Sequence, residues 1–294
     1  RKDDPNFPNA TLIKEEVLLP SSKIERSYPT FSPDGKELAF IQDRRKLMVM
    51  NLESKKVREI TDGTLWHSTA GGFEYEWSPD GKWFTLCFIG NKHDPYSDIG
   101  IVSAQGGKIT NLTNSGYASG SPRWVMDGSA VLFASERYGM RNHASWGSME
   151  DVFLCFVNQD AYDKYRLSKE DYELLKEVEK EQEKLKKNAE KKDAKKDDKK
   201  DDKKDEKPNK DIVMELDGIQ DRIVRLTPNS SNLGSAILDK KGENLYYLAS
   251  FEKGMDLCVM NMEDRSIKVV SKGVYGSLYP TADDKYMYLL SGSG

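Results

Sequence analysis

The chain has 294 residues, of which 32% are charged and 37% hydrophobic, and its formal net charge is −4. The charge is concentrated in residues 176–210, where 27 of 35 positions are Lys, Asp or Glu, so the remainder has the charge density of an ordinary globular domain. Outside residues 176–210 the chain is mildly acidic, which argues against nucleic acid as the main partner. No apolar run is long enough to span a membrane. Three cysteines do not make a disulfide framework.

A turn-forming sequence recurs along the chain, and an apolar run follows each copy. In the clearest copies Pro sets the first corner of the turn, Asp bonds the local backbone and Gly takes the positive φ that closes it. The turn-final positions are 46, 47 and 43 residues apart in neighbouring copies, apart from one longer interval. The copies lie at residues 28–36, 73–82, 121–128, 236–242 and 279–285.

Two further strand-like runs follow each apolar run, which makes four short strands per period. Four-stranded units repeated at this period are typical of β-propeller blades, whereas a β-sandwich does not explain the repeated turn. We therefore predict an all-β propeller with about four complete blades and partial blades at both ends. Residues 11–19 resemble an outer strand of a preceding blade. Cys87, Cys155 and Cys258 lie in apolar runs and are predicted to be small buried residues.

The longer interval indicates an insertion. Gly128 and Gly242 are 114 residues apart, about 67 more than the period allows. We predict propeller blades over residues 1–157, an insertion over 158–222 between the third and fourth strands of blade three, and continued propeller over 223–294.

The insertion carries a helix-start signal. Ser168 stands at a cap position with Asp171 three residues later, and Leu167 and Tyr172 have the spacing of a hydrophobic staple. Beyond about Lys187 the Lys/Asp alternation predicts a frayed helix or disorder. Two interpretations remain open, a solvated spacer and a docking arm for another subunit. The helix continues on a thin stripe of Leu175, Val178, Gln182 and Leu185.

Propeller topology places the Pro-Asp-Gly turns and the insertion on one face and the other loops on the opposite face. Aromatic, Arg and His side chains on that opposite face suit contact with a peptide or a partner, although long loops also collect such residues without function. No metal or cofactor is expected, because the three His are widely spaced and no Cys lies near them. The candidate contact residues are Trp66, His67, His93, Tyr96, Arg141, His143 and Trp146.

Two sequence signatures of hydrolytic enzymes are missing from this chain. There is no Gly-x-Ser-x-Gly elbow and no His-Glu-x-x-His motif. No catalytic residue is therefore predicted, and we do not expect hydrolysis by this segment alone.

Three longer stretches, residues 123–128, 137–148 and 217–227, resemble the tricorn protease homologs of bacteria, which also carry a Lys/Glu-rich insertion at this place. The resemblance implies that the chain is a propeller segment of a longer serine peptidase, in which a PDZ domain and a catalytic domain follow. None of the family's catalytic residues can be carried over to this chain.

By this resemblance the segment guides or gates peptides or unfolded polypeptide and packs against the PDZ and catalytic domains. The alternative is a TolB-like periplasmic propeller that serves as a scaffold for protein–protein contacts. A homo-oligomer is open in either case. The resemblance implies a periplasmic location, with the cytoplasm as the alternative.

Overall fold

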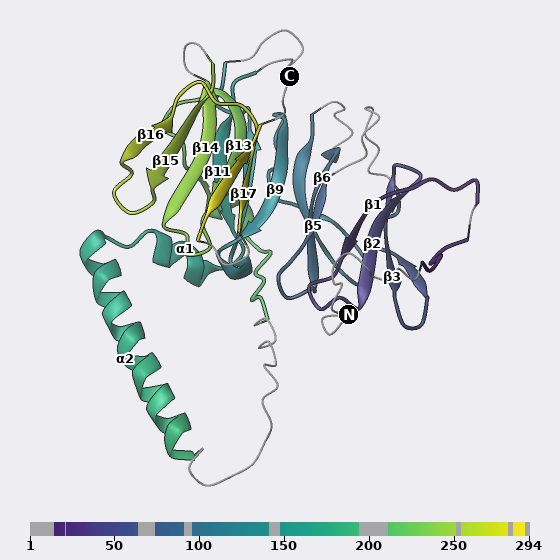
Figure 1. The fold of residues 1–294 in the computed structure, drawn as a ribbon, viewed down its shortest axis with the longest axis horizontal. Coiled ribbons are helices and arrows are strands. Elements are labelled where there is room, and N and C mark those ends of the chain that lie inside the picture. The colour runs from purple at the N-terminus through teal and green to yellow at the C-terminus, as the bar shows by residue number, and fades with distance from the viewer. Residues whose placement is uncertain are drawn as a thin grey trace, which may run out of the picture.

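A computed structural model of the chain shows antiparallel β-sheets arranged side by side, with one long helix that extends away from them (Figure 1). The sheets are meanders, in which every strand pairs with the next one along the chain. The structure describes residues 15–20, 22–63, 74–90, 96–140, 148–193, 211–250, 254–281 and 285–291.

Four of the sheets have four strands and correspond to the predicted blades, which confirms the propeller-type architecture. Blade one contains β1 (Arg26–Phe31), β2 (Glu37–Gln42), β3 (Lys46–Asn51) and β4 (Val57–Glu59). Blade two contains β5 (Tyr75–Trp77), β6 (Trp83–Phe88), β7 (Asp98–Ser103) and β8 (Thr110–Asn111). Blade three contains β9 (Ser119–Val125), β10 (Ala130–Ser135), β11 (Asp151–Phe156) and β12 (Ile223–Arg225). Blade four contains β13 (Asn232–Leu238), β14 (Asn244–Ser250), β15 (Asp256–Asn261) and β16 (Ile267–Ser271).

The two ends of the chain differ from a complete blade. After blade four, β17 (Ser277–Pro280) and β18 (Met287–Leu290) pair with each other and form a partial blade, as predicted. At the other end, residues 15–20 form no strand, and residues 11–14 of the expected outer strand lie outside the described residues. Leu18 and Leu19 pack instead against a small buried cluster on blade one that includes Phe40 and Met50.

The predicted turn chemistry is present at the first turn of blades one and two. The Asp34 carboxylate accepts hydrogen bonds from the Ser32 hydroxyl at 2.7 Å and the Lys36 amide at 3.1 Å. Gly35 has φ of +68°, which is in the left-handed region that favours glycine. Blade two repeats this pattern, because Asp80 accepts from the Ser78 hydroxyl at 2.6 Å.

In three blades a threonine directly after or near the end of the fourth strand makes the same hydrogen bond to the third strand. Its hydroxyl oxygen accepts a hydrogen bond from an amide at the beginning of the third strand, which ties the outer strand to the sheet. The donor and acceptor pairs are Leu47 and Thr61 at 2.9 Å, Ile99 and Thr113 at 3.1 Å, and Val152 and Thr227 at 3.1 Å.

The core consists of apolar layers between neighbouring blades. Because successive side chains in a strand point to opposite faces, Val131 of β10 packs toward blade two while Leu132 packs toward blade four. This explains why the middle strands are almost continuously apolar. The layers contain Val49 and Phe84 between blades one and two, Ile101 and Phe133 between two and three, and Leu154 and Tyr247 between three and four.

Two helices lie between β11 and β12 of blade three, α1 (Gln159–Tyr165) and α2 (Lys169–Asp193). The predicted helix start is confirmed, since the Asp171 amide donates to the Ser168 hydroxyl oxygen at 3.2 Å. The helix α1 was not predicted from the sequence, and Asn158 caps it by accepting a hydrogen bond from the Ala161 amide at 2.9 Å. The helix α2 continues six residues past Lys187, and residues 194–210 lie outside the described residues.

Candidate functional site

Most of the contact residues predicted for the face opposite the turns lie outside the residues that the structure describes. Tyr96 is half-buried at the beginning of the segment that leads into β7. The other six residues, Trp66, His67, His93, Arg141, His143 and Trp146, lie outside the described residues. That contact face therefore stays a prediction.

The insertion rests on the turn face of the propeller at its return segment. The Ile212 amide donates to Asp80 Oδ2 at 3.0 Å, and Asp211 pairs with Lys82 at 2.6 Å. Ile212 packs directly against Gly128, in the corresponding turn of blade three, so a side chain at that position would have to displace the Ile212 side chain. The return segment thus crosses the turns of two blades.

Residues 217–227, one of the stretches that resembles tricorn homologs, lock this return segment in place. Arg222 is 5% exposed, and its guanidinium donates to the backbone carbonyls of Phe156 at 3.1 Å, Asp217 at 3.2 Å and Glu215. Gln220 donates to the Asn111 carbonyl of blade two at 3.1 Å. The stretch therefore has a structural role, since hydrogen bonds from one buried guanidinium tie the return segment to the end of β11.

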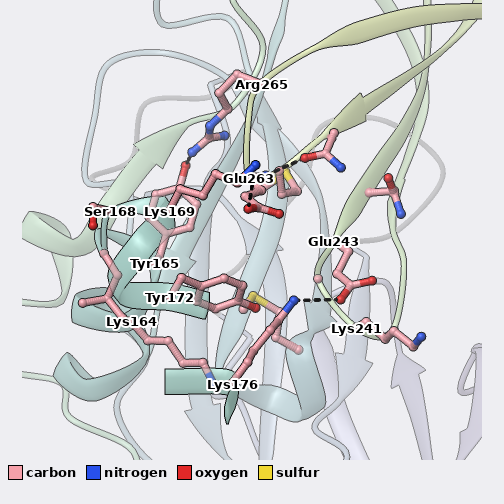
Figure 2. Close-up of a pocket in the computed structure, with 16 residues that line it drawn as sticks. Lys164, Tyr165, Ser168, Lys169, Tyr172, Lys176, Lys241, Glu243, Glu263 and Arg265 are labelled. Carbon is pink, nitrogen blue, oxygen red and sulfur yellow. Dashed lines mark hydrogen bonds and ion pairs between the residues drawn. The ribbon is translucent and has the colours of Figure 1, made fainter. Parts of the chain in front are cut away.

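A cavity of about 460 Å³ lies where the insertion leaves the propeller, between the two helices and the turns of blade four. Its size is in the range of small-ligand and peptide side-chain sites. One wall comes from α1 and α2, and the other comes from the β13–β14 and β15–β16 turns (Figure 2). The labelled lining residues are Lys164, Tyr165, Ser168, Lys169, Tyr172, Lys176, Lys241, Glu243, Glu263 and Arg265.

Ion pairs join the two walls of the cavity. Lys176 Nζ lies 3.2 Å from Glu243 Oε1, and Lys169 Nζ lies 3.6 Å from Glu263 Oε1. Desolvation opposes the charge of Lys176, but the hydrogen bond to Glu243 and the neighbouring negative groups outweigh it and raise the pKa of the ammonium. These exposed pairs hold the helix against blade four with only modest energy.

Aromatic rings and a cation form a further part of the cavity surface. The Arg265 guanidinium lies 4.9 Å from the centre of the Tyr165 ring and also donates to its hydroxyl. Burial lowers the pKa of Arg265, which nonetheless stays charged at neutral pH. Among the described residues, no carboxylate forms an ion pair with Arg265. Cations beside tyrosine rings suit contact with backbone carbonyls and carboxylates of a peptide.

Two of the described cysteines are poor nucleophiles. Cys87 and Cys155 are buried, and burial raises the pKa of each thiol to about 12, so both are protonated at neutral pH. The prediction of small buried cysteines is confirmed for all three. No histidine is among the described residues, and within them no group of His, Cys, Asp and Glu is arranged to hold a metal ion.

This cavity was not predicted from the sequence. The helix after Ser168 was expected as a solvated spacer or as a docking arm for another subunit, and α1, whose Tyr162 and Tyr165 pack against Phe156 of the blade, was not expected. The signal that could have found it was two aromatic residues three positions apart directly after a predicted strand, followed by a helix cap. In the described part of the chain, no helix has the length and apolarity needed to cross a membrane.

Comparisons with known proteins place the fold among propellers. No protein-family model matches the chain. A stretch of 110 residues is 28% identical to "Uncharacterized peptidase YuxL" of Bacillus subtilis (strain 168), and it covers 35% of this chain and 16% of that protein.

Solved structures match over almost the whole chain. The tricorn protease structure covers 90% of this chain and 24% of its own, with a TM-score of 0.56 and 12% identity. TolB from Acinetobacter baumannii covers 92% of this chain and 49% of its own, with a TM-score of 0.50 and 14% identity. At these identities the likeness shows the fold alone, which is that of the propeller in a peptidase and in TolB. The chain spans a quarter or less of the two peptidases.

Proposed function

We propose that this chain is a non-catalytic propeller segment of a tricorn-like serine peptidase, which guides or gates peptide substrates and packs against a PDZ domain and a catalytic domain of the same parent chain. The observation that carries the proposal is the agreement of two comparisons, a propeller fold like that of tricorn protease and a sequence stretch like that of a peptidase.

Two surfaces are candidates for peptide contact in this proposal. One is the loop face with Tyr96, Arg141, His143 and Trp146, and the other is the cavity beside α2. The cavity offers the Arg265 guanidinium next to the Tyr165 ring, an arrangement suited to a peptide carboxylate and its neighbouring apolar atoms.

The guiding role is tested by cleavage of long peptides. Replacing Arg141, His143 and Trp146 by Ala in the full-length parent is expected to slow cleavage of long peptides and to leave cleavage of short ones unchanged. If long peptides are cleaved at the unaltered rate, the loop face has no gating role.

The cavity is tested separately by peptide binding to this chain. Fluorescence anisotropy with a labelled unfolded polypeptide is expected to show weaker binding for Arg265→Ala. Arg44→Ala is the matched control, because Arg44 pairs with Glu25 at 3.1 Å on blade one, away from the cavity. Equal binding by both variants would remove the cavity from the proposal.

A TolB-like scaffold is the second candidate function, and the TolB structure supports it at nearly the same TM-score. The two candidates differ in the rest of the gene. A PDZ domain and a serine-bearing catalytic domain encoded downstream of this segment would select the peptidase, whereas an open reading frame that holds only a propeller would select the scaffold.

A further inference from the structure

The helix α2 carries an exposed apolar stripe that the propeller does not cover. Leu174, Val178 and Leu185 are 61%, 44% and 69% exposed. At 100° per residue they lie within about 40° of one another around the helix axis. They also have the a and d spacing of a heptad, four and seven residues apart.

The stripe lies on the side of α2 that faces away from blade four. Tyr172 and Lys176, which line the cavity, are about 140–180° from the stripe on the helix wheel. Contacts with α1 and blade four hold the first turns of α2, down to the ion pair of Glu179 with Lys164 at 2.8 Å. Beyond Glu179, no hydrogen bond or ion pair joins a described side chain of α2 to the propeller. Figure 1 shows the helix leading away from the blades.

The charges beside the stripe have opposite sign in the two halves of the helix. Glu177 and Lys184 occupy the same flank of the stripe, one heptad apart. In an antiparallel pair of such helices, each Glu of this flank meets a Lys of the other copy. In this pair Leu174 of one copy lies opposite Leu185 of the other. The same antiparallel alignment of the two helices therefore forms both the apolar contacts and the charge pairs.

We propose that α2 pairs antiparallel with α2 of a second copy of this chain and so makes a two-fold symmetric dimer. The interface is self-complementary, as a two-fold axis requires. The axis crosses the helix near residues 179–181, where Glu181 takes a d position and weakens the apolar seam. The association is therefore of low affinity, and it concerns the insertion irrespective of what the propeller binds.

Sedimentation velocity of the full chain over about 1 µM to 1 mM tests the pairing. The wild type is expected to dimerise in this range. Leu174→Ala with Leu185→Ala is expected to raise the dissociation constant about tenfold or more, because both apolar layers are lost. Glu181→Leu is expected to lower it by a similar factor. Circular dichroism confirms that the helix persists in each variant.

Charge exchange tests the antiparallel direction. Glu177→Lys and Lys184→Glu are each expected to weaken the dimer, since like charges then face each other, and the double variant is expected to restore it. Lys180→Glu is the matched control for Lys184→Glu, because it makes the same charge change about 140° from the stripe. A monomer at every concentration overturns the proposal, as does a dimer that Leu174→Ala with Leu185→Ala leaves unchanged. A double variant weaker than both single ones overturns the antiparallel arrangement.

Discussion

Blade one and blade two begin with the same turn but use it differently. In both turns one carboxylate oxygen of the aspartate accepts the local hydrogen bonds. The second oxygen of Asp34 lies 3.6 Å from the exposed Lys36 ammonium, whereas the second oxygen of Asp80 accepts from the Ile212 amide at 3.0 Å. The turn thus forms through local hydrogen bonds to one carboxylate oxygen of the aspartate. The second oxygen accepts a hydrogen bond from a distant segment only in blade two, where the insertion lies beside the turn.

Blade one differs from blades two, three and four because the insertion contacts the turns of only those three blades among the described residues. The insertion contacts the turns of blades two, three and four through Ile212, Asp211 and Lys176. None of its described residues is hydrogen-bonded to or paired with the turn of blade one. The insertion is therefore part of the propeller surface where it leaves and rejoins the blades, and it is a separate arm only along α2 beyond Glu179.

The largest effect is expected from the core beneath the insertion. Leu154→Ala removes a fully buried side chain between blades three and four, at a cost of about 2–5 kcal/mol in the free energy of unfolding. Leu47→Ala is the matched control in blade one, where a leucine is equally buried. Both should lower the urea midpoint, but only Leu154→Ala should speed hydrogen exchange in α1, because Tyr162 and Tyr165 pack against the same cluster as Leu154. Equal exchange in the two variants would contradict the coupling of the insertion to blade three.

A smaller effect is expected at the lock of the return segment. Arg222→Ala leaves three backbone carbonyls without their donor, which costs about 1–3 kcal/mol. Hydrogen exchange is expected to rise at the Glu215 amide, which donates to the Val157 carbonyl at 2.8 Å. Arg44→Ala serves as the control, since its exposed pair on blade one should contribute little.

The turns at Asp34 and Asp80 compare a turn without a contact from the insertion with a turn that Ile212 of the insertion contacts. Asp34→Ala and Asp80→Ala both lose the local turn hydrogen bonds, and Asp80→Ala also loses the bond to Ile212. The covered turn should therefore be more sensitive, by about 0.5–1.5 kcal/mol in chemical denaturation. Equal losses would mean that the Ile212 bond contributes nothing to stability.

The smallest effect is expected at the exposed pair that joins α2 to blade four. Lys176→Met should cost no more than about 1 kcal/mol, and less at high salt. Because folding raises the pKa of Lys176, the stabilisation is present below about pH 10.5, the ordinary value, and is lost as the pH rises above it. Thermal melts of wild type and variant at low salt should converge above this pH. A difference that persists there would assign the effect to packing instead of charge.

The sequence predicted the parts of the fold that depend on local chemistry. The Ser-Pro-Asp-Gly turns and the period of the blades needed only neighbouring residues, as did the cap at Ser168, and all three are confirmed. Leu18 and Leu19 looked like a strand because their run is apolar, but they pack as single side chains on blade one. The helix α1 was missed because its seven residues are too few for a periodic pattern.

The candidate site needed the tertiary structure. Lys176 and Glu243 are 67 residues apart, and Asp80 and Ile212 are 132 apart, so no local pattern relates them. The sequence alone determined that the chain builds blades, because turns, alternation and capping are set within a few residues of each other. The tertiary structure decided which turns the insertion covers and where the cavity forms, because those contacts depend on how separate blades are placed in space.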